Sequence, residues 1–401
     1  MRRLLVVDDD PKVLQALEAQ FKAHRDHWDM VFVTSGEAAL AELRERHADV
    51  IITDVRMPGM DGADLLQRVQ AESPETLRII HASDADQQAS MRAVGFAHQV
   101  LTSPCTPSVL AETLDRARGV MDIVACDEVR SMVGRLMALP VRPEIHSQIV
   151  KCLRDPNASN EAVAELIERD MAMVAKILQV ANSGFFGASR RITRLSEAVG
   201  FLGFRMVENL AFSLAVFDTG RKVRGIDVGA LQRHALNTGL IARELVGNVR
   251  DADDAFLAGV LHDIGIYLIA ANLPESFKEA TDAQRAQNLP LHTVETNLWG
   301  GSHAAVGAYL LGLWNMPMHI VEAVALHHSL HDERANTELV AVVHTADVFA
   351  HEIAMAPCPA EQDPAPTLNL AFLEAAGFLG QVEAWRELAR EQFEDGLKET
   401  A

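Results

Sequence analysis

The chain has 401 residues, more than the roughly 100 to 200 of a usual single domain, so its length indicates two or three domains. Hydrophobic residues make up 49% of the sequence, which excludes a disordered chain and suffices for sizeable cores. The formal charge of -20 opposes general binding to nucleic-acid phosphates, so a nucleic-acid partner is not expected.

Neither cysteine usage nor hydropathy points to a secreted or membrane protein. The cysteines lie far apart and form no CxxC pair, which excludes a thiolate zinc site and a disulfide framework. The N-terminal apolar run "LLVV" ends at "DDD", too early for a signal peptide. No segment has the ~18 to 20 uninterrupted apolar residues of a spanning helix. We therefore expect a cytoplasmic protein without membrane insertion.

Strand-like and helical patterns alternate over the first 120 residues. The runs "LLVV", "MVFVTS" and "DVIITD" are typical of strands, and "PKVLQALEAQF" has helical spacing. This alternation predicts a doubly wound parallel sheet, which binds ligands beyond the carboxyl ends of its strands. Because Asp8, Asp9 and Asp54 follow two such strands, they are expected to converge on a hard cation, and carboxylates suit Mg²⁺.

These residues resemble the receiver domain of bacterial two-component response regulators. The resemblance rests on "VVDDD", on "IITDVRMPGMDG" and on Ser83 in "IIHASD". It implies five parallel strands and a sensor histidine kinase or phosphotransfer protein as partner. It also implies roles for individual residues: Asp54 as phospho-acceptor, Mg²⁺ bound by Asp8, Asp9, Asp54 and the backbone of Arg56, and Ser83 as a hydrogen-bond donor to the phosphoryl group.

Two positions depart from the receiver pattern near the last strand. In "VLTSPCTP", Val100 stands where the family has an aromatic residue, and Ser103 stands where it has lysine. A serine can donate a hydrogen bond to a phosphoryl oxygen, but it carries no ammonium charge. Phosphorylation or its read-out is therefore expected to be weakened or replaced. Asp10 and Pro11 are expected to cap and begin the first helix instead of binding metal.

Helical periodicity dominates after the receiver, and the rest of the chain is predicted to be all-α. We expect a receiver at residues 1–120, a helical connector at 121–134, an output domain at 135–355, and a Pro-rich break with a helical tail at 356–401. If one helix ran continuously through the connector, it would act as a lever between the two domains. That relay is a hypothesis from position alone.

The output half resembles HDOD domains, which are related to the HD metal-dependent phosphohydrolases. Its most telling portion is "ANSGFFG", where Asn182, Ser183, Phe186 and Gly187 are expected to have structural roles. The histidines and aspartates that follow resemble the ligand order of HD hydrolases: His234, His262, Asp263, His303, His327, His328 and Asp347. Imidazole with carboxylate suits Zn, Mn or Fe.

A structural interpretation of the same histidines stays open. HDOD domains are generally regarded as degenerate at the metal site, and a buried histidine is often a core residue. Ile266 stands where the phosphodiesterase subgroup named HD-GYP has lysine, and the Gly-Tyr-Pro segment of that subgroup is missing. Those losses remove a candidate cationic stabiliser and a substrate-facing loop.

Two functional hypotheses follow from the sequence. The first is a response regulator that accepts a phosphoryl group on Asp54 and relays it to a non-catalytic HDOD domain, which binds a downstream signalling protein. The second is a receiver-controlled metallophosphohydrolase acting on a cyclic dinucleotide or nucleotide. Homodimerisation is a family-level expectation, and DNA binding is disfavoured by the charge balance.

Overall fold

The computed structural model describes most of the chain, and the account below is confined to those residues. They are 1–83, 96–103, 107–124, 126–134, 148–149, 151–153, 155, 157–182, 191–204, 206–207, 223, 225–246, 249–314, 316–330, 337–353 and 366–399. The chain divides into two compact units, centred on residues 1–137 and 138–401. Each unit is described by itself.

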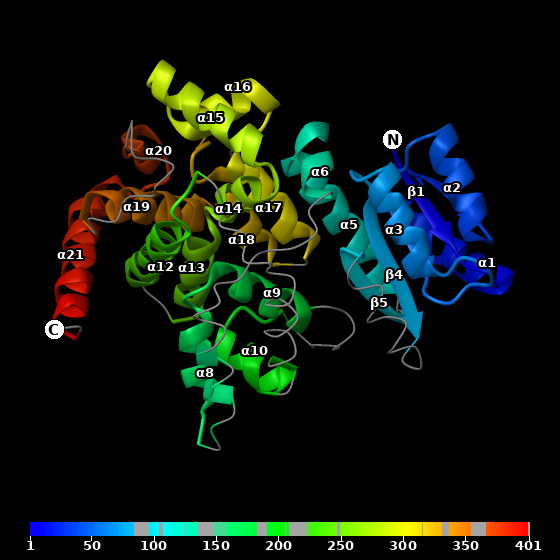
Figure 1. Cartoon of the computed structure of the whole chain (residues 1–401), viewed down its shortest axis with the longest axis horizontal. Coiled ribbons are helices and arrows are strands. Elements are labelled where there is room, and N and C mark those ends of the chain that lie inside the picture. Colours follow the sequence, from blue (N-terminus) through cyan, green and yellow to red (C-terminus); the bar gives the residue numbers. More distant parts are fainter. Residues whose placement is uncertain are drawn as a thin grey trace. The chain divides into compact units, whose positions relative to one another are not determined.

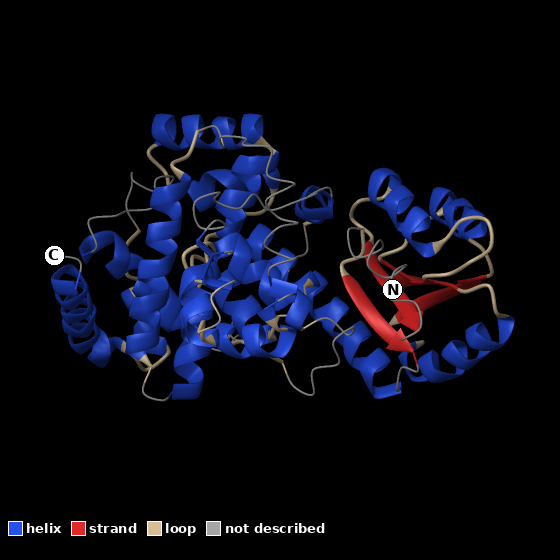
Figure 2. Cartoon of the chain, turned by 60° about the horizontal axis from the view of Figure 1, so that its bottom comes forward, coloured by secondary structure: helices blue, strands red, loops and turns tan. Residues whose placement is uncertain are grey.

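The first unit is built on a five-stranded parallel sheet with helices on both faces (Figure 2). Its strands lie in the order β2-β1-β3-β4-β5. They are β1 (Arg2–Val7), β2 (Trp28–Val33), β3 (Val50–Asp54), β4 (Leu77–Ser83) and β5 (Gln99–Ser103). The predicted doubly wound α/β fold is therefore confirmed.

The helices of this unit follow from local sequence signals. They are α1 (Pro11–Gln20), the short η1 (Phe21–His24), α2 (Gly36–Glu45), α3 (Gly62–Glu72) and α5 (Pro107–Ile123). Asp10 caps α1 as expected, because its carboxylate accepts a hydrogen bond of 2.8 Å from the Lys12 N–H and Pro11 is the first helical residue. On one sheet face, Leu5, Ile51 and Ile80 pack with α2 and α3 in a buried core.

The strand register brings the polar residues to one edge of the sheet. Val7 pairs with Thr53, and Asp54 pairs with His81. Because the strands are parallel, their carboxyl ends lie at the same edge, and residues in register point to the same face. Asp8, Asp54 and His81 therefore come from three neighbouring strands.

The connector is two helices, so the single continuous helix required by the lever hypothesis is not present. Helix α5 ends at Ile123, and α6 (Asp127–Gly134) begins after a break. The last carbonyl of α6, on Gly134, accepts a hydrogen bond of 3.2 Å from the Arg78 guanidinium and one of 3.4 Å from Gln70. Arg78 is buried. The end of the connector is therefore fixed to the first unit itself.

The second unit is helical throughout its described residues, as predicted (Figure 1). Its helices are α8 (Asn160–Ile167), α9 (Met171–Ala181), α10 (Leu195–Leu202), α12 (Val228–Leu245), α13 (Val249–Leu261), α14 (Ile264–Asn272), α15 (Pro274–Gln287), α16 (Leu291–Trp299), α17 (His303–Leu313), α18 (Met318–Leu326), α19 (Thr337–Ile353), α20 (Leu370–Ala375) and α21 (Val382–Glu399), with a 3-10 turn at Leu379–Gln381. Asn182 is buried, whereas Ser183, Phe186 and Gly187 lie outside the described residues.

Glycines let the central helices cross closely. A Cβ on Gly259 of α13 would lie 2.7 Å from the Cα of Gly239 on α12. A Cβ on Gly265 of α14 would collide with the carbonyl oxygen of His303 at the start of α17. Larger residues would separate these helices, so the glycines fix how near the polar residues of α12, α13, α14 and α17 come to one another.

One described segment, Asp251–Asn272, is long and apolar enough by composition to cross a membrane. It spans α13 and α14, is interrupted by the turn at His262 and Asp263, and 89% of its most apolar window is buried inside the protein. The sequence expectation considered only uninterrupted apolar runs and so passed over it. The segment forms the core of the helical unit.

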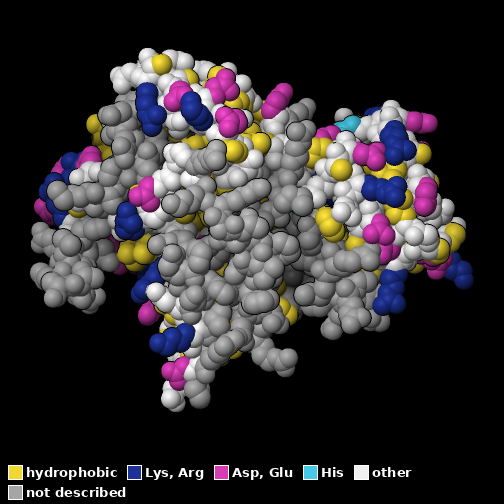
Figure 3. All heavy atoms as spheres, viewed as in Figure 1, with side chains coloured by type: hydrophobic (Ala, Val, Ile, Leu, Met, Phe, Trp, Pro, Cys, Tyr) yellow, Lys and Arg dark blue, Asp and Glu magenta, His cyan; other side chains and the backbone are white. Residues whose placement is uncertain are grey.

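On the face in Figure 3, exposed acidic and basic side chains are interspersed.

The C-terminal tail is helical, as predicted, and covers part of the helical unit. Helix α21 packs on α12 and α19. Its Arg386 guanidinium lies 5.2 Å from the ring centroid of Phe349 on α19, and Trp385 is buried. Much of the predicted Pro-rich break lies outside the described residues.

Gly259→Ala tests the close crossing of α12 and α13. Because the new methyl group would be forced against Gly239, we expect a loss of about 1 to 3 kcal/mol in the free energy of unfolding. Chemical denaturation followed by circular dichroism measures it. Gly380→Ala is the matched control: a Cβ there meets no atom within 4 Å, so the change should stay within about 0.5 kcal/mol. Equal stability of the two variants would contradict the argument.

Candidate functional site

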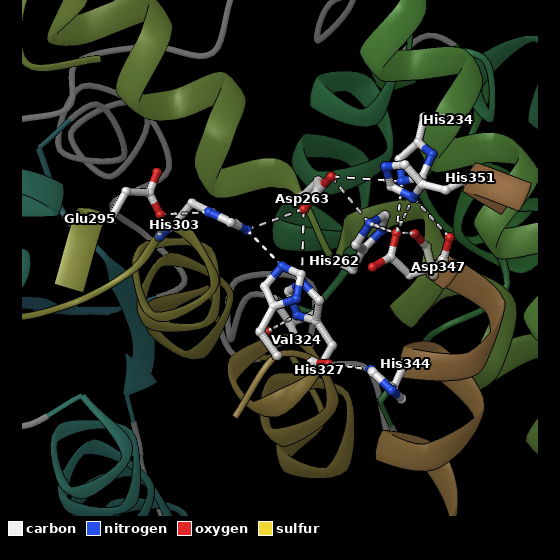
Figure 4. A network of polar contacts seen from close by, with 12 residues as sticks. His234, His262, Asp263, Glu295, His303, Val324, His327, His344, Asp347 and His351 are labelled. Carbon is white, nitrogen blue, oxygen red and sulfur yellow. Dashed lines mark hydrogen bonds and ion pairs between the residues drawn. The ribbon is translucent and has the colours of Figure 1, made fainter. Parts of the chain in front are cut away.

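All seven residues predicted as HD-type ligands come together in the second unit. Figure 4 labels all of them except His328. His234 lies on α12, His262 and Asp263 form the turn between α13 and α14, and His303 begins α17; His327 and His328 follow α18, and Asp347 lies on α19. His328 is half-buried and the other six are buried. The seven residues therefore lie together, and their role as metal ligands stays a prediction.

Asp263 lies at the centre of the cluster and faces two groups of histidines (Figure 4). Its Oδ2 is 3.2 Å from His262 Nε2 and 3.9 Å from His234 Nε2. Its Oδ1 is 3.4 Å from His303 Nε2 and 3.8 Å from His327 Nε2. One carboxylate is thus shared by two candidate metal positions.

The first position has the spacing of a coordination shell. His234 Nε2 is 3.0 Å from Asp347 Oδ1, and His262 Nε2 is 3.6 Å from the same oxygen. Metal–ligand bonds of about 2.1 Å place adjacent ligand atoms about 3.0 to 3.4 Å apart and opposite ones about 4.2 Å apart. The observed distances lie close to this range, so His234, His262, Asp263 and Asp347 fit a transition-metal ion.

The second position is formed by Asp263, His303, His327 and His328. His303 Nε2 is 3.2 Å from His328 Nε2. Burial lowers the pKa of His328 to about 3, with His303 adding to the effect, and burial also lowers the pKa of His327. Both imidazoles are therefore neutral at pH 7, which is the form that binds metal.

Hydrogen bonds orient three of the rings so that Nε2 points into the cluster. The Nδ1 of His262 lies 2.6 Å from the Gly259 carbonyl oxygen, and that of His327 lies 2.7 Å from the Val324 carbonyl oxygen. The Nδ1 of His303 lies 2.6 Å from the Glu295 carboxylate. A ring that donates its Nδ1–H in this way leaves the lone pair on Nε2 for a metal.

Several buried ligand atoms of the cluster have no hydrogen-bond partner within the described residues. They are Nε2 of His262, Nε2 of His327, both carboxylate oxygens of Asp263 and Oδ2 of Asp347. Native interiors rarely leave so many buried polar atoms unsatisfied together. Their convergence is what a cation site requires, and it distinguishes this cluster from a set of ordinary core histidines.

The charges in the cluster are strongly coupled. Burial would raise the pKa of Asp263, but His262 and His303 outweigh it and hold that pKa well below its usual range. Asp347 behaves similarly, because His234, His262 and His351 outweigh its burial and lower its pKa. Burial opposes a proton on His262, yet the two carboxylates raise the pKa of that ring well above its usual value. Two buried anions therefore attract positive charge to this point.

Three supporting residues were missed by the sequence analysis: Glu295, His344 and His351. Glu295 is buried and also accepts a hydrogen bond of 2.8 Å from the His303 N–H. The His344 Nδ1 lies 2.9 Å from the His327 carbonyl oxygen, and the His351 Nδ1 lies 3.2 Å from Asp347 Oδ1. The i, i+4 spacing of Asp347 and His351 could have revealed one of them. No sequence signal marked Glu295.

In the first unit, the acidic residues gather at the carboxyl edge of the sheet. Ligand atoms of Asp8, Asp54 and His81 lie within 4.8 Å of one another, whereas Asp9 is exposed. Burial raises the pKa of Asp8, and the neighbouring acids add to the effect. The Arg56 N–H donates a hydrogen bond of 2.9 Å to Asp54 Oδ2.

For the predicted hydrogen-bond donors to a phosphoryl group, the structure describes only the position of the backbone. Ser83 on β4 pairs with Ser103 on β5, and Val100 also lies on β5. The side chains of these three residues lie outside the described part of the structure. Their roles stay predictions.

Comparison with known proteins matches this chain to two families and to several individual proteins. Residues 4–115 match the response regulator receiver domain, and residues 139–330 match the HDOD domain. An uncharacterized protein of Treponema pallidum (strain Nichols) is 29% identical over 205 residues, which are 50% of this chain and 39% of that protein. The sensory transduction protein RegX3 of Mycobacterium tuberculosis (strain ATCC 25618 / H37Rv) is 27% identical over 150 residues, 37% of this chain and 64% of that protein.

The chain thus covers less than two thirds of either relative's length. Among solved structures, the MmoQ response regulator of Methylococcus capsulatus str. Bath is 22% identical with a TM-score of 0.48, over 62% of this chain and 97% of that one. The sheet topology, the helical second unit and the two family matches agree. The chain is a response regulator, with an N-terminal receiver domain and a C-terminal HDOD domain.

Proposed function

We propose that this response regulator accepts a phosphoryl group on Asp54 and thereby controls a metal-dependent phosphohydrolase centre in its HDOD domain. The observation that carries the proposal is the set of buried ligand atoms on His262, Asp263, His327 and Asp347 that converge without forming hydrogen bonds to the described residues. The preferred sequence-based hypothesis was a non-catalytic output domain. The geometry supports the alternative better, because a degenerate site would not keep every ligand and its orienting hydrogen bonds.

In the receiver, the residues supply a nucleophile and a cation site. Receiver domains imply a phosphodonor kinase as partner and are typically Mg²⁺-dependent. Asp8 and Asp54 would hold the ion, with Asp9 and the backbone of Arg56 as further ligands. The Asp54 carboxylate would attack the phosphoryl group of a phosphohistidine, and the imidazole would leave. Ser83 and Ser103 would donate hydrogen bonds to the phosphoryl oxygens.

In the HDOD domain, a bound pair of transition-metal ions such as Mn, Fe or Zn would activate a water molecule and polarise a phosphoryl oxygen. Asp263 would hold both positions and so fix their separation. Glu295 would keep His303 in the tautomer that binds through Nε2. The buried surroundings of these residues strengthen their electrostatic effect on a phosphoester, such as a nucleotide or cyclic dinucleotide.

A second candidate function is a non-catalytic output that binds another signalling protein. It is favoured by Ile266, which occupies the position of a lysine in the phosphodiesterase subgroup and is buried, and by the missing Gly-Tyr-Pro segment. The two candidates differ in one measurable property. A metal-dependent phosphohydrolase must bind metal, whereas an interaction domain need not.

Metal content tests the proposed function directly. Protein purified without chelator should contain one or two transition-metal ions per chain, measured by inductively coupled plasma mass spectrometry. His262→Ala and Asp347→Ala should each lose at least one ion, because each removes a ligand from the first position. His319→Ala, which alters a histidine paired with Asp254 outside the cluster, should keep the wild-type content.

If the wild-type protein contained no metal even after reconstitution with Mn, Fe and Zn, the phosphohydrolase proposal would be refuted. The second candidate function would then stand. If metal were bound, hydrolysis of cyclic dinucleotides and nucleotides would be assayed next, with the unaltered chain compared to the same two variants.

Glu295→Gln tests the second metal position separately. The amide keeps the size of the side chain but removes the charge that supports His303, so affinity at this position should fall about 10- to 100-fold. Calorimetric titration with Mn²⁺ should show one weakened site beside one unchanged site, because Glu295 does not contact the first group. Equal weakening of both sites would contradict the division of the cluster.

Asp54→Asn tests the phospho-acceptor. Incubation with a small phosphodonor such as phosphoramidate should add one phosphoryl group to the wild-type chain and none to this variant, as measured by intact mass. Asp10→Asn is the matched control, since asparagine caps a helix as well as aspartate does and α1 should be retained. Phosphorylation of Asp54→Asn at the wild-type level would move the acceptor elsewhere.

A further inference from the structure

His81 is a buried imidazole beside the proposed phospho-acceptor. It lies on β4 directly in register with Asp54 on β3, so the two side chains leave the sheet on the same face. Asp8, which follows β1, lies on the other side of Asp54. The three residues therefore form a row across three adjacent strands, with His81 at one end.

The ring of His81 lies near both carboxylates. One of its nitrogens lies within 4.8 Å of a carboxylate oxygen of both Asp8 and Asp54. The His81 side chain is only 8% exposed, and its ring makes no hydrogen bond to any residue that the structure describes. The neighbouring carboxylate oxygens would share a cation with a nitrogen of this ring.

The donor set determines which cation fits. Carboxylates with water suit Mg²⁺, whereas imidazole favours first-row transition metals. Adding a nitrogen to two oxygens changes an oxygen-only site into a mixed one. The separation limit of 4.8 Å is close to the ~4.2 Å between opposite ligands at bonds of about 2.1 Å, so small side-chain adjustments suffice.

We propose that His81 is a third ligand of the receiver's cation site, together with Asp8 and Asp54, and that this site binds a first-row transition-metal ion through a nitrogen ligand. The inference rests on the proposed function, in which these two aspartates hold the receiver's ion. It adds a ligand and a class of metal. Ser103 carries no positive charge, so the negative charge of the carboxylates is left to be offset by the bound ion.

The test uses Co²⁺ and Mg²⁺ as probes of the full-length chain. The variant His262→Ala/Asp347→Ala serves as background, because it removes ligands from the helical cluster. In this background, His81→Leu should weaken Co²⁺ binding at one site at least about 10-fold, since even outer-shell partners of a metal cost that much. Mg²⁺ affinity should be unchanged, because its oxygen ligands remain. Calorimetry gives the affinities, and the visible spectrum of Co²⁺ should lose its nitrogen-ligand character.

Two controls separate the explanations. His47→Leu removes an exposed receiver histidine that pairs with Glu75 outside the pocket, and it should leave Co²⁺ binding intact. His81→Gln repeats the test with a polar side chain, in case leucine disturbs β4. In the chain that carries no other substitution, His81→Leu should lower the number of Co²⁺ ions bound per chain by one.

Equal Co²⁺ affinity with and without His81 would overturn this inference while leaving the receiver's Mg²⁺ site in place. Failure of the receiver to bind either ion would instead refute the proposed cation site, and this inference with it.

Discussion

Asp263 and Asp347 carry negative charge into the protein interior, where an ionised carboxylate is strongly unfavourable unless cations or donors surround it. Four imidazoles surround these two residues at 3.0 to 3.9 Å, and they come from α12, the α13–α14 turn, the start of α17 and the end of α18. The glycines at the α12–α13 and α14–α17 crossings make that approach sterically feasible. Much of the packing of the helical unit can thus be understood as the means of surrounding two buried anions.

The sequence predicted those parts of the structure that depend on local order along the chain. Parallel strands end at one edge of a sheet, so the convergence of Asp8 and Asp54 followed from strand patterns alone. The HD-type ligands were found because a family resemblance fixed their order. Glu295 and His81 could not be found this way, because their roles depend on which helices and strands become neighbours, and hydrophobic periodicity does not specify that.

For a related reason, the sequence did not reveal that the connector lacks the continuous helix required by the lever hypothesis. Apolar spacing continues through residues 121–134, yet the helix breaks before Asp127, and α6 ends against the first unit through Arg78. Arg78 is the second residue of β4, and His81 lies three residues later on the same strand. One strand therefore joins the candidate cation site at the carboxyl edge of the sheet to the point that holds the connector at the opposite edge.

The candidate metal ligands of the helical cluster also bear on the stability of the folded domain. His234 and Asp347 are 113 residues apart in sequence, yet their side chains are 3.0 Å apart. An ion bound by both residues would close a loop of that length, and the entropy lost on closing a loop grows with the logarithm of its length. The folded domain has already lost that entropy, whereas the unfolded chain rarely has a preformed site, so the ion would stabilise the folded domain, and losing it would loosen the domain as well as empty the site.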